Sequence, residues 1–173
     1  MESALASASI SGTTSVSKSG TWLAFDYGAW RIGVAVGEHL LGSARPVRTL
    51  QHCNAHQIDW ISIAALIEEW RPIGFAVGWP LMDSGETYPV AAFIRRFGQR
   101  LHGRFDLPVH YVDERLSSEQ AEAQVTARHG KTKVKKTPGL IDAMAAAIIL
   151  ETFFSQNQAG FSTEAPTASS SPS

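Results

Sequence analysis

The chain has 173 residues, of which 44% are apolar and 18% are charged, so it can bury one substantial core and is short for two ordinary domains. Its formal net charge of -1 lacks the basic excess that is typical of a strongly cationic nucleic-acid binder. No apolar run reaches about eighteen residues and no secretory leader pattern begins the chain, so we expect a cytoplasmic protein without membrane spans.

Both ends of the chain have the composition of flexible tails. Residues 1–20 are mostly Ser, Ala, Thr, Gly and Val, and residues 155–173 are rich in Ser, Thr, Ala, Gln and Pro. Neither stretch has the apolar periodicity that would offset the entropy cost of ordering. We therefore expect one domain over residues 21–154, between a disordered N-terminal tail (1–20) and a disordered C-terminal tail (155–173).

Three strands are predicted at the start of the domain. Trp22–Asp26 and Arg31–Val36 flank a turn at Gly28, which is a hairpin pattern. A third strand is predicted at Pro46–Leu50, after the turn at Gly42. Three consecutive strands with short connections favour an antiparallel meander.

Helices and strands alternate in the rest of the domain. Helical periodicity, short apolar runs and a capping pattern at Ser117 indicate these elements. In chain order they are a helix over His56–Trp70, a strand at Ile73–Val77, a helix over Val90–Leu101, a strand at Val109–Val112, a helix from Ser117, and a helix over Leu140–Phe154.

This order predicts an α/β fold with a mixed five-stranded sheet, in which two parallel strands extend the meander and helices flank the sheet. Right-handed crossovers are expected to place both later strands beside the first. The carboxyl end of the first strand then lies near the centre of the sheet edge where ligands bind.

Acidic residues occupy three privileged positions of this predicted fold. Asp26 ends the first strand, Asp113 and Glu114 end the last strand, and Asp142 lies in the first turn of the last helix. Two carboxylates about 4 Å apart repel by about 4 kcal/mol at an effective dielectric of about 20, so their convergence requires a cation. Carboxylates suit Mg²⁺ or Mn²⁺, and such ions can promote phosphodiester hydrolysis.

Each acidic position also has a simpler interpretation. Asp26 with Gly28 is typical of a turn, and Asp142 is favourable near a helix N-terminus through the helix dipole. Asp113 and Glu114 could belong to a solvated charge run. Because successive strand residues point to opposite faces, only one of these two acids can share the direction of Asp26.

A basic segment precedes the last predicted helix. The chain has five lysines, and four of them lie within it: Lys131, Lys133, Lys135 and Lys136. The segment could contact nucleic-acid phosphates, or it could be a solvated connection.

Four motifs together resemble the YqgF family, also called RuvX. They are Asp26-Tyr27-Gly28-Ala29-Trp30-Arg31-Ile32-Gly33-Val34-Ala35, Val77-Gly78-Trp79-Pro80, Val112-Asp113-Glu114-Arg115-Leu116-Ser117, and Ile141-Asp142-Ala143 with Ala145-Ala146. The resemblance covers nearly all of residues 21–154. It implies an RNase H-like fold related to the RuvC resolvases, and a bacterial nuclease that matures the 5′ end of pre-16S ribosomal RNA.

The resemblance also implies roles for particular residues. The acidic positions of the family fall on Asp26, Glu114 and Asp142, which would be the catalytic, metal-binding residues, with Asp113 as an alternative or supporting acid. We expect Arg31, Arg115 and the four lysines to contact substrate phosphates.

Two other functions remain open at this point. The same metal site could resolve branched DNA such as a Holliday junction, which would require a symmetric dimer. Alternatively, the chain could be a non-catalytic RNA-binding factor in ribosome assembly. RNA and DNA present the same phosphodiester, so the sequence leaves the substrate, and a monomer or homodimer, undecided.

Overall fold

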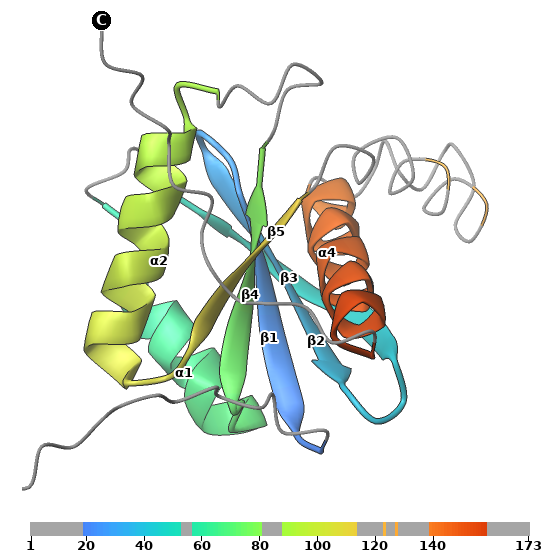
Figure 1. Cartoon of the computed structure of the whole chain (residues 1–173). Helices are drawn as coiled ribbons and strands as arrows, with labels where there is room; N and C mark the ends of the chain where they lie inside the picture. The colour runs from blue at the N-terminus through green and yellow to red at the C-terminus, as the bar shows by residue number, and fades with distance from the viewer. Residues whose placement is uncertain are drawn as a thin grey trace, which may run out of the picture.

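The computed structural model describes residues 19–52, 57–80, 88–113 and 139–158, with the single positions 123 and 127. Eight elements have assigned bounds, and their labels are those of Figure 1. In chain order they are β1 (Thr21–Tyr27), β2 (Arg31–Glu38), β3 (Ser43–Gln51), α1 (Trp60–Trp70), β4 (Gly74–Trp79), α2 (Ala91–Phe105), β5 (Val109–Asp113) and α4 (Leu140–Gln158). The start of the helix predicted from Ser117 lies outside the described residues.

The five strands form one sheet in the order β3-β2-β1-β4-β5. Strand β2 pairs antiparallel with both β1 and β3, whereas β1 with β4 and β4 with β5 are parallel pairs. This confirms the meander with two added parallel strands and places β1 at the centre. The expectation that both later strands lie beside β1 was wrong for β5, because β2 and β4 already occupy the two edges of β1.

The helices cover both faces of the sheet (Figure 1). Leu23, Phe25 and Tyr27 of β1 belong to the core cluster beneath α1 and α2. The alternate residues Trp22 and Ala24 pack in the cluster formed with α4. This alternation of side chains along β1 fixes the face on which each later residue of the strand lies.

Local capping explains where α1 begins and ends. The helix starts at Trp60 instead of the predicted His56, because the Asp59 carboxylate accepts hydrogen bonds from the Ser62 backbone N–H (2.9 Å) and hydroxyl (2.6 Å). It ends at Trp70, and the following residue, Arg71, adopts a left-handed conformation with φ of 45° just before Pro72. Residue His56 itself lies outside the described residues.

Helix α4 is the most buried helix of the described structure. Its residues from Ala143 to Leu150 are all buried against the sheet. Small side chains permit this close packing, and Ala146 and Ala147 form a cluster with Ala35 of β2. The helix continues to Gln158, beyond the predicted end at Phe154.

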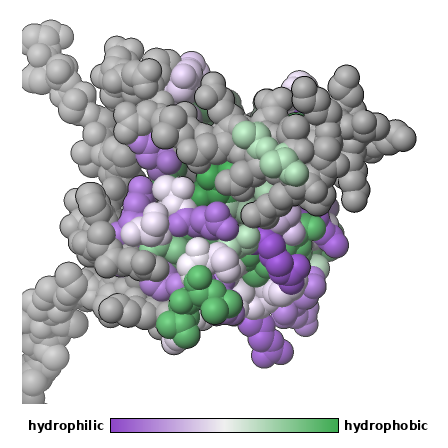
Figure 2. Space-filling model, turned by 90° about the vertical axis from the view of Figure 1, so that its right-hand side faces the viewer, coloured by the Kyte–Doolittle hydropathy of each residue, from purple (hydrophilic) through white to green (hydrophobic). Residues whose placement is uncertain are grey.

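The face of the molecule that lies to the right in Figure 1 is shown in Figure 2. Its coloured surface is a mixture of polar and apolar residues, with one green group protruding at the lower margin. The turn between β2 and β3 exposes two leucines, Leu40 (75%) and Leu41 (74%).

Of the helices in the described part of the chain, none is both long and apolar enough to cross a membrane.

Candidate active site

Asp26 lies near the carboxyl end of the central strand β1. Its side chain is half-buried, and by alternation it takes the same face as Ala24, the face covered by α4. On the neighbouring strand β2, Asp26 pairs with Gly33. Asp26 therefore lies on the face of the sheet that is covered by α4, the helix that carries Asp142.

A row of residues across three strands supports the start of α4. Thr49 of β3 pairs with Gly33 of β2, which in turn pairs with Asp26. The Thr49 hydroxyl donates a hydrogen bond of 2.5 Å to the carbonyl oxygen of Gly139, the residue before α4. Gly139 has a φ of +88°, a conformation that favours glycine, so the chain turns into the helix directly above β3.

Gly33 lets the first turn of α4 rest on the sheet. A Cβ atom added at Gly33 would overlap the backbone carbonyl of Asp142 and would lie 2.8 Å from the backbone nitrogen of Ala143. Asp142 is therefore held above Gly33, the immediate cross-strand neighbour of Asp26. The structure thus brings two predicted acids from distant parts of the chain to one face of one sheet edge.

An ion pair partly neutralises this acidic position. The Arg31 Nε lies 3.0 Å from the Asp142 Oδ2, and the two side chains are 48% and 27% exposed. Arg31 begins β2 and is oriented by the hairpin turn, in which the Gly28 N–H donates to the Arg31 carbonyl at 2.8 Å. The residue expected to contact substrate thus also contacts a proposed metal ligand.

The acid at the end of β5 points to the other face of the sheet. Asp113 pairs with Trp79 of β4, and its neighbour Val112 packs with the α4 cluster. By alternation Asp113 lies on the face of α1 and α2, away from Asp26. Glu114, Arg115 and the lysines Lys131, Lys133, Lys135 and Lys136 lie outside the described residues.

The donor set at this edge fits a hard divalent cation. Carboxylate oxygens are preferred ligands of Mg²⁺ and Mn²⁺, and Mg²⁺ is commonly held by one or two protein carboxylates with substrate phosphates. Asp26 and Asp142 provide two such groups. Within the ranges that the structure describes, no group of three or more His, Cys, Asp or Glu side chains could hold a metal ion.

A model of the RuvX family, described as a Holliday junction resolvase, matches residues 20–156 of this chain. The chain belongs to the RuvX family. Its similarity to named relatives is high: a protein of Methylobacillus flagellatus is 44% identical over 80% of this chain and 92% of its own length. One of Cronobacter sakazakii is 42% identical over 80% and 99%, respectively. Both relatives carry the name "Putative pre-16S rRNA nuclease".

The fold of this RuvX protein is similar to that of a solved resolvase. The structure of Thermus thermophilus RuvC in complex with a Holliday junction substrate aligns with a TM-score of 0.51 and 16% identity, covering 83% of this chain and 98% of that chain. At this identity the likeness concerns the fold alone. It confirms the RNase H-like architecture that the sequence motifs implied.

Several residues that position the site of this RuvX protein were not among the predicted site residues. Thr49 and Gly33 hold the start of α4, and His52 fixes the β1–β2 turn. The His52 Nε2 is 2.8 Å from the Gly28 carbonyl oxygen and therefore carries the hydrogen, while the His52 backbone N–H donates to Trp30. Of these positioning residues, only Gly33 had a sequence signal: a glycine within an apolar strand indicates that another backbone approaches closely.

Tyr27, the residue after Asp26, packs on the opposite face of the sheet, beneath α1 and α2. Tyr27 is buried, and its ring centroid is 5.3 Å from that of His52 and 5.2 Å from that of Phe97. Burial raises the pKa of the Tyr27 phenol above its usual range, and the positive charge of Arg100 opposes this rise. The phenol therefore stays protonated at neutral pH and contributes no charge beside Asp26.

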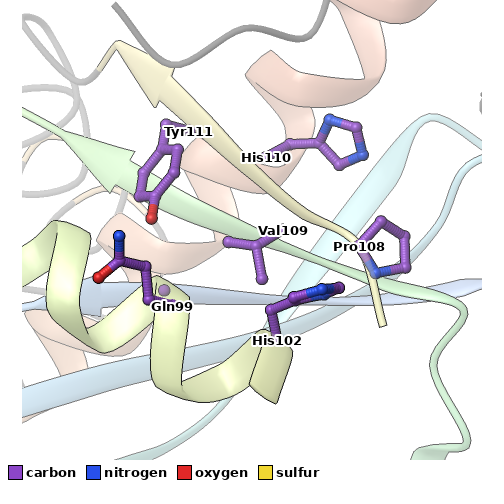
Figure 3. Close-up of a pocket in the computed structure, with 7 residues that line it drawn as sticks. Gln99, His102, Pro108, Val109, His110 and Tyr111 are labelled. Atoms are coloured by element: carbon purple, nitrogen blue, oxygen red, sulfur yellow. The ribbon is translucent and has the colours of Figure 1, made fainter. Parts of the chain in front are cut away.

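A pocket of about 340 Å³ lies elsewhere, between α2 and β5. Figure 3 shows Gln99 and Tyr111 directed towards each other and the His102 ring directed towards Pro108, whereas His110 points to the opposite side of β5. The Tyr111 hydroxyl donates to the Arg95 carbonyl at 3.2 Å. The lining residues that the structure describes include no carboxylate, so this donor set does not fit the metal chemistry expected of the acidic edge.

Proposed function

We propose that this RuvX protein is a metal-dependent nuclease that processes the 5′ end of pre-16S ribosomal RNA in the bacterial cytoplasm. The proposal rests mainly on one observation, the seating of Asp142 on Gly33, beside Asp26. The names of the curated relatives support the choice of RNA substrate. The reaction is hydrolysis: a water oxygen bonds to phosphorus, and the bond from phosphorus to one ester oxygen breaks.

Asp26, Asp142 and Glu114 would hold Mg²⁺ or Mn²⁺. Such an ion, when bound, would supply the activation of a water molecule and the stabilisation of charge on the leaving oxygen. Asp113 lies at the end of β5 on the opposite face, and an extended chain would return the next residue, Glu114, to the face of Asp26. We therefore keep Glu114 as the third ligand and Asp113 as a supporting residue.

The basic residues have separate tasks in this proposal. Arg31 contacts the Asp142 carboxylate at 3.0 Å and would compete with a metal ion for it, and its exposed side chain also reaches solvent, where substrate phosphates would approach. Arg115 and the lysines Lys131, Lys133, Lys135 and Lys136 would contact the RNA backbone. Such contacts provide affinity without reading sequence, so specificity would come from RNA shape or from the pre-ribosome.

The decisive experiment compares two isosteric substitutions. In Asp26→Asn the carboxylate at the acidic edge is lost, whereas in Asp106→Asn an exposed carboxylate at the end of α2 is lost. Asp106 has a φ of 53°, a conformation that asparagine tolerates. Loss of groups that merely support metal ligands costs about 10- to 100-fold, so we expect Asp26→Asn to slow cleavage of a pre-16S leader RNA at least about a hundredfold. Asp106→Asn should cleave normally; equal rates for wild type and Asp26→Asn would refute the assignment.

A second candidate is resolution of branched DNA. The description of the family model and the RuvC-like fold favour it. Paired, symmetric cuts would require a homodimer, whereas leader processing could be carried out by a monomer. Rates on a four-way DNA junction and on the leader RNA, measured at matched salt and metal, distinguish the two functions, and sedimentation during the reaction shows the oligomeric state.

A further inference from the structure

Helix α2 concentrates positive charge in a chain that is almost neutral overall. Its fifteen residues include four arginines, at positions 95, 96, 100 and 104, and no aspartate or glutamate. The whole chain carries a net charge of only -1. The arginines of α2 were not among the predicted substrate contacts, and helix stability does not require so many like charges.

Four residues of α2 form a stripe along one side of the helix. Phe93, Arg96, Arg100 and Arg104 follow one another at intervals of three, four and four residues, which places them in line on a helix. We call this set the arginine stripe. It extends over about 16 Å at a rise of about 1.5 Å per residue. Phe93 is 48% exposed, Arg96 and Arg104 are exposed and Arg100 is half-buried, so the stripe is accessible at both ends and partly accessible between them.

An indole of α1 fixes two arginines of the stripe. The guanidinium carbons of Arg100 and Arg104 lie 4.9 Å and 4.5 Å from the ring centroid of Trp60. The Trp60 ring in turn stacks on Phe97 at 5.8 Å. Arginines four residues apart on a helix repel each other, and contact with an aromatic face offsets this repulsion. The two guanidinium groups are thereby ordered before any ligand binds.

The arginine stripe starts near the edge of the sheet that carries the acids. Figure 1 shows that α2 begins beside the end of β4 and runs away from this edge. Arg95, in the second turn of α2, lies over the ring of Trp79 at 5.4 Å, and Trp79 is the last residue of β4. Trp79 pairs with Asp113, and the next strand, β1, ends with Asp26 and Tyr27. A strand of RNA at this edge can therefore continue onto α2.

We propose that the arginine stripe binds single-stranded RNA that flanks the cleaved bond. Arg96, Arg100 and Arg104 bind successive phosphates, and a base stacks on Phe93. An exposed aromatic ring favours unpaired RNA, because bases stacked within a duplex do not present a free face. This inference rests on the proposed nuclease function and adds the strandedness of the substrate and the path that it takes.

The test measures binding of a fluorescent single-stranded RNA to the full chain in EDTA, at several salt concentrations. Each phosphate contact on a single strand contributes about 0.7 to the slope of log affinity against log salt. We expect Arg96→Gln and Arg104→Gln to lower this slope by about 0.7 each, and the double variant by about 1.4. Phe93→Ala should weaken binding about fivefold or more without changing the slope.

Control variants remove an arginine or an exposed apolar side chain elsewhere on the surface. Arg71→Gln removes an exposed arginine after α1, and Leu40→Ala removes an exposed apolar side chain. Both should bind as wild type does, and Arg104→Lys should retain most of the slope. Thermal midpoints of all variants should match wild type, which separates binding from folding.

Two results would overturn the inference: an unchanged slope in the double variant, or an equal loss in Arg71→Gln. The two proposals fail in different ways. Stripe variants that bind and cleave leader RNA normally refute the stripe and leave the nuclease function intact. A wild-type protein that binds RNA through the stripe yet never cleaves it refutes the nuclease function and leaves the stripe intact.

Discussion

Replacing Gly33 with alanine tests how the acidic site is assembled. Gly33 lies in the middle of the row from Thr49 to Asp26, and the backbone of Asp142 occupies the space where its Cβ would be. The obstacle is a backbone carbonyl and the following peptide nitrogen, which cannot rotate away as a flexible side chain can. Gly33→Ala must therefore shift the first turn of α4 away from β2.

The expected loss of stability follows from two opposing effects. Overpacking a close contact costs about 1–3 kcal/mol. Removing the conformational freedom of glycine from the unfolded chain returns about 0.5–1 kcal/mol. Gly33 does not have a positive φ, so no backbone strain is added by the new side chain. We expect a net destabilisation of about 1–2 kcal/mol.

The assays compare Gly33→Ala with Gly103→Ala. Apart from the neighbouring residues and the backbone of its own helix, nothing lies within 4 Å of a Cβ added at Gly103, which is in an exposed part of α2. This control should therefore gain about 0.5–1 kcal/mol from helix propensity. Urea unfolding measures both changes. Cleavage of leader RNA should fall in Gly33→Ala even at temperatures where it is fully folded, since Asp142 moves relative to Asp26. Wild-type stability and wild-type cleavage in Gly33→Ala would show that α4 does not depend on this contact.

Two further substitutions test the charges near the sheet. Arg31→Gln removes the guanidinium that contacts Asp142 and would compete with a metal ion for its carboxylate. An exposed ion pair contributes about 0.2–1 kcal/mol, so the Mn²⁺ affinity measured by calorimetry should rise by up to about fivefold. A weaker Mn²⁺ affinity in Arg31→Gln would contradict this competition. Burial lowers the pKa of His110 in the folded protein below its usual value of 6.5. Near pH 6 the unfolded chain therefore binds a proton at His110 that the folded chain does not. The free energy of unfolding then falls as the pH drops below about 6.5 towards the folded pKa. His110→Phe should reduce this pH dependence in thermal unfolding from pH 5 to 7, as measured at about half-unit steps, and an unchanged profile would assign the effect to other groups.

The sequence predicted the positions of the strands and helices along the chain better than it predicted which strands lie side by side in the sheet. Apolar runs and helical spacing located every strand that the structure describes, within a few residues. The start of α1 was misplaced because the Asp59 cap acts through one local hydrogen-bond pattern that periodicity does not reveal. The place of β5 was missed because it depends on which edge of β1 remains open, and that is decided by β2 and β4 together.

The features of the candidate site that depend on local geometry were predictable from the sequence, whereas those that depend on contacts between distant elements were not. Strand alternation indicated that only one acid after β5 could share the face of Asp26, and the structure places Asp113 on the opposite face. The contact of Arg31 with Asp142 was not predictable, since it requires α4 to rest on β2 at one particular residue. Gly33 stood within a recognised motif, yet its role depends on a backbone far along the chain.

The net charge of the chain conceals a separation of charge between the two faces of the sheet. Asp26 and Asp142 lie on the face of α4, whereas the arginines of α2 lie on the other face and begin near the same edge. Charges more than about 8 Å apart are largely screened at physiological salt, so each face acts on a ligand locally and the total charge has little influence. An RNA strand that crosses this edge would meet the arginines of α2 on one side, where Asp113 also lies, and Asp26 and Asp142 with Arg31 on the other. Affinity and cleavage would then depend on different residues, so the salt dependence of binding should be altered by substitutions in α2 and left unchanged by Asp26→Asn.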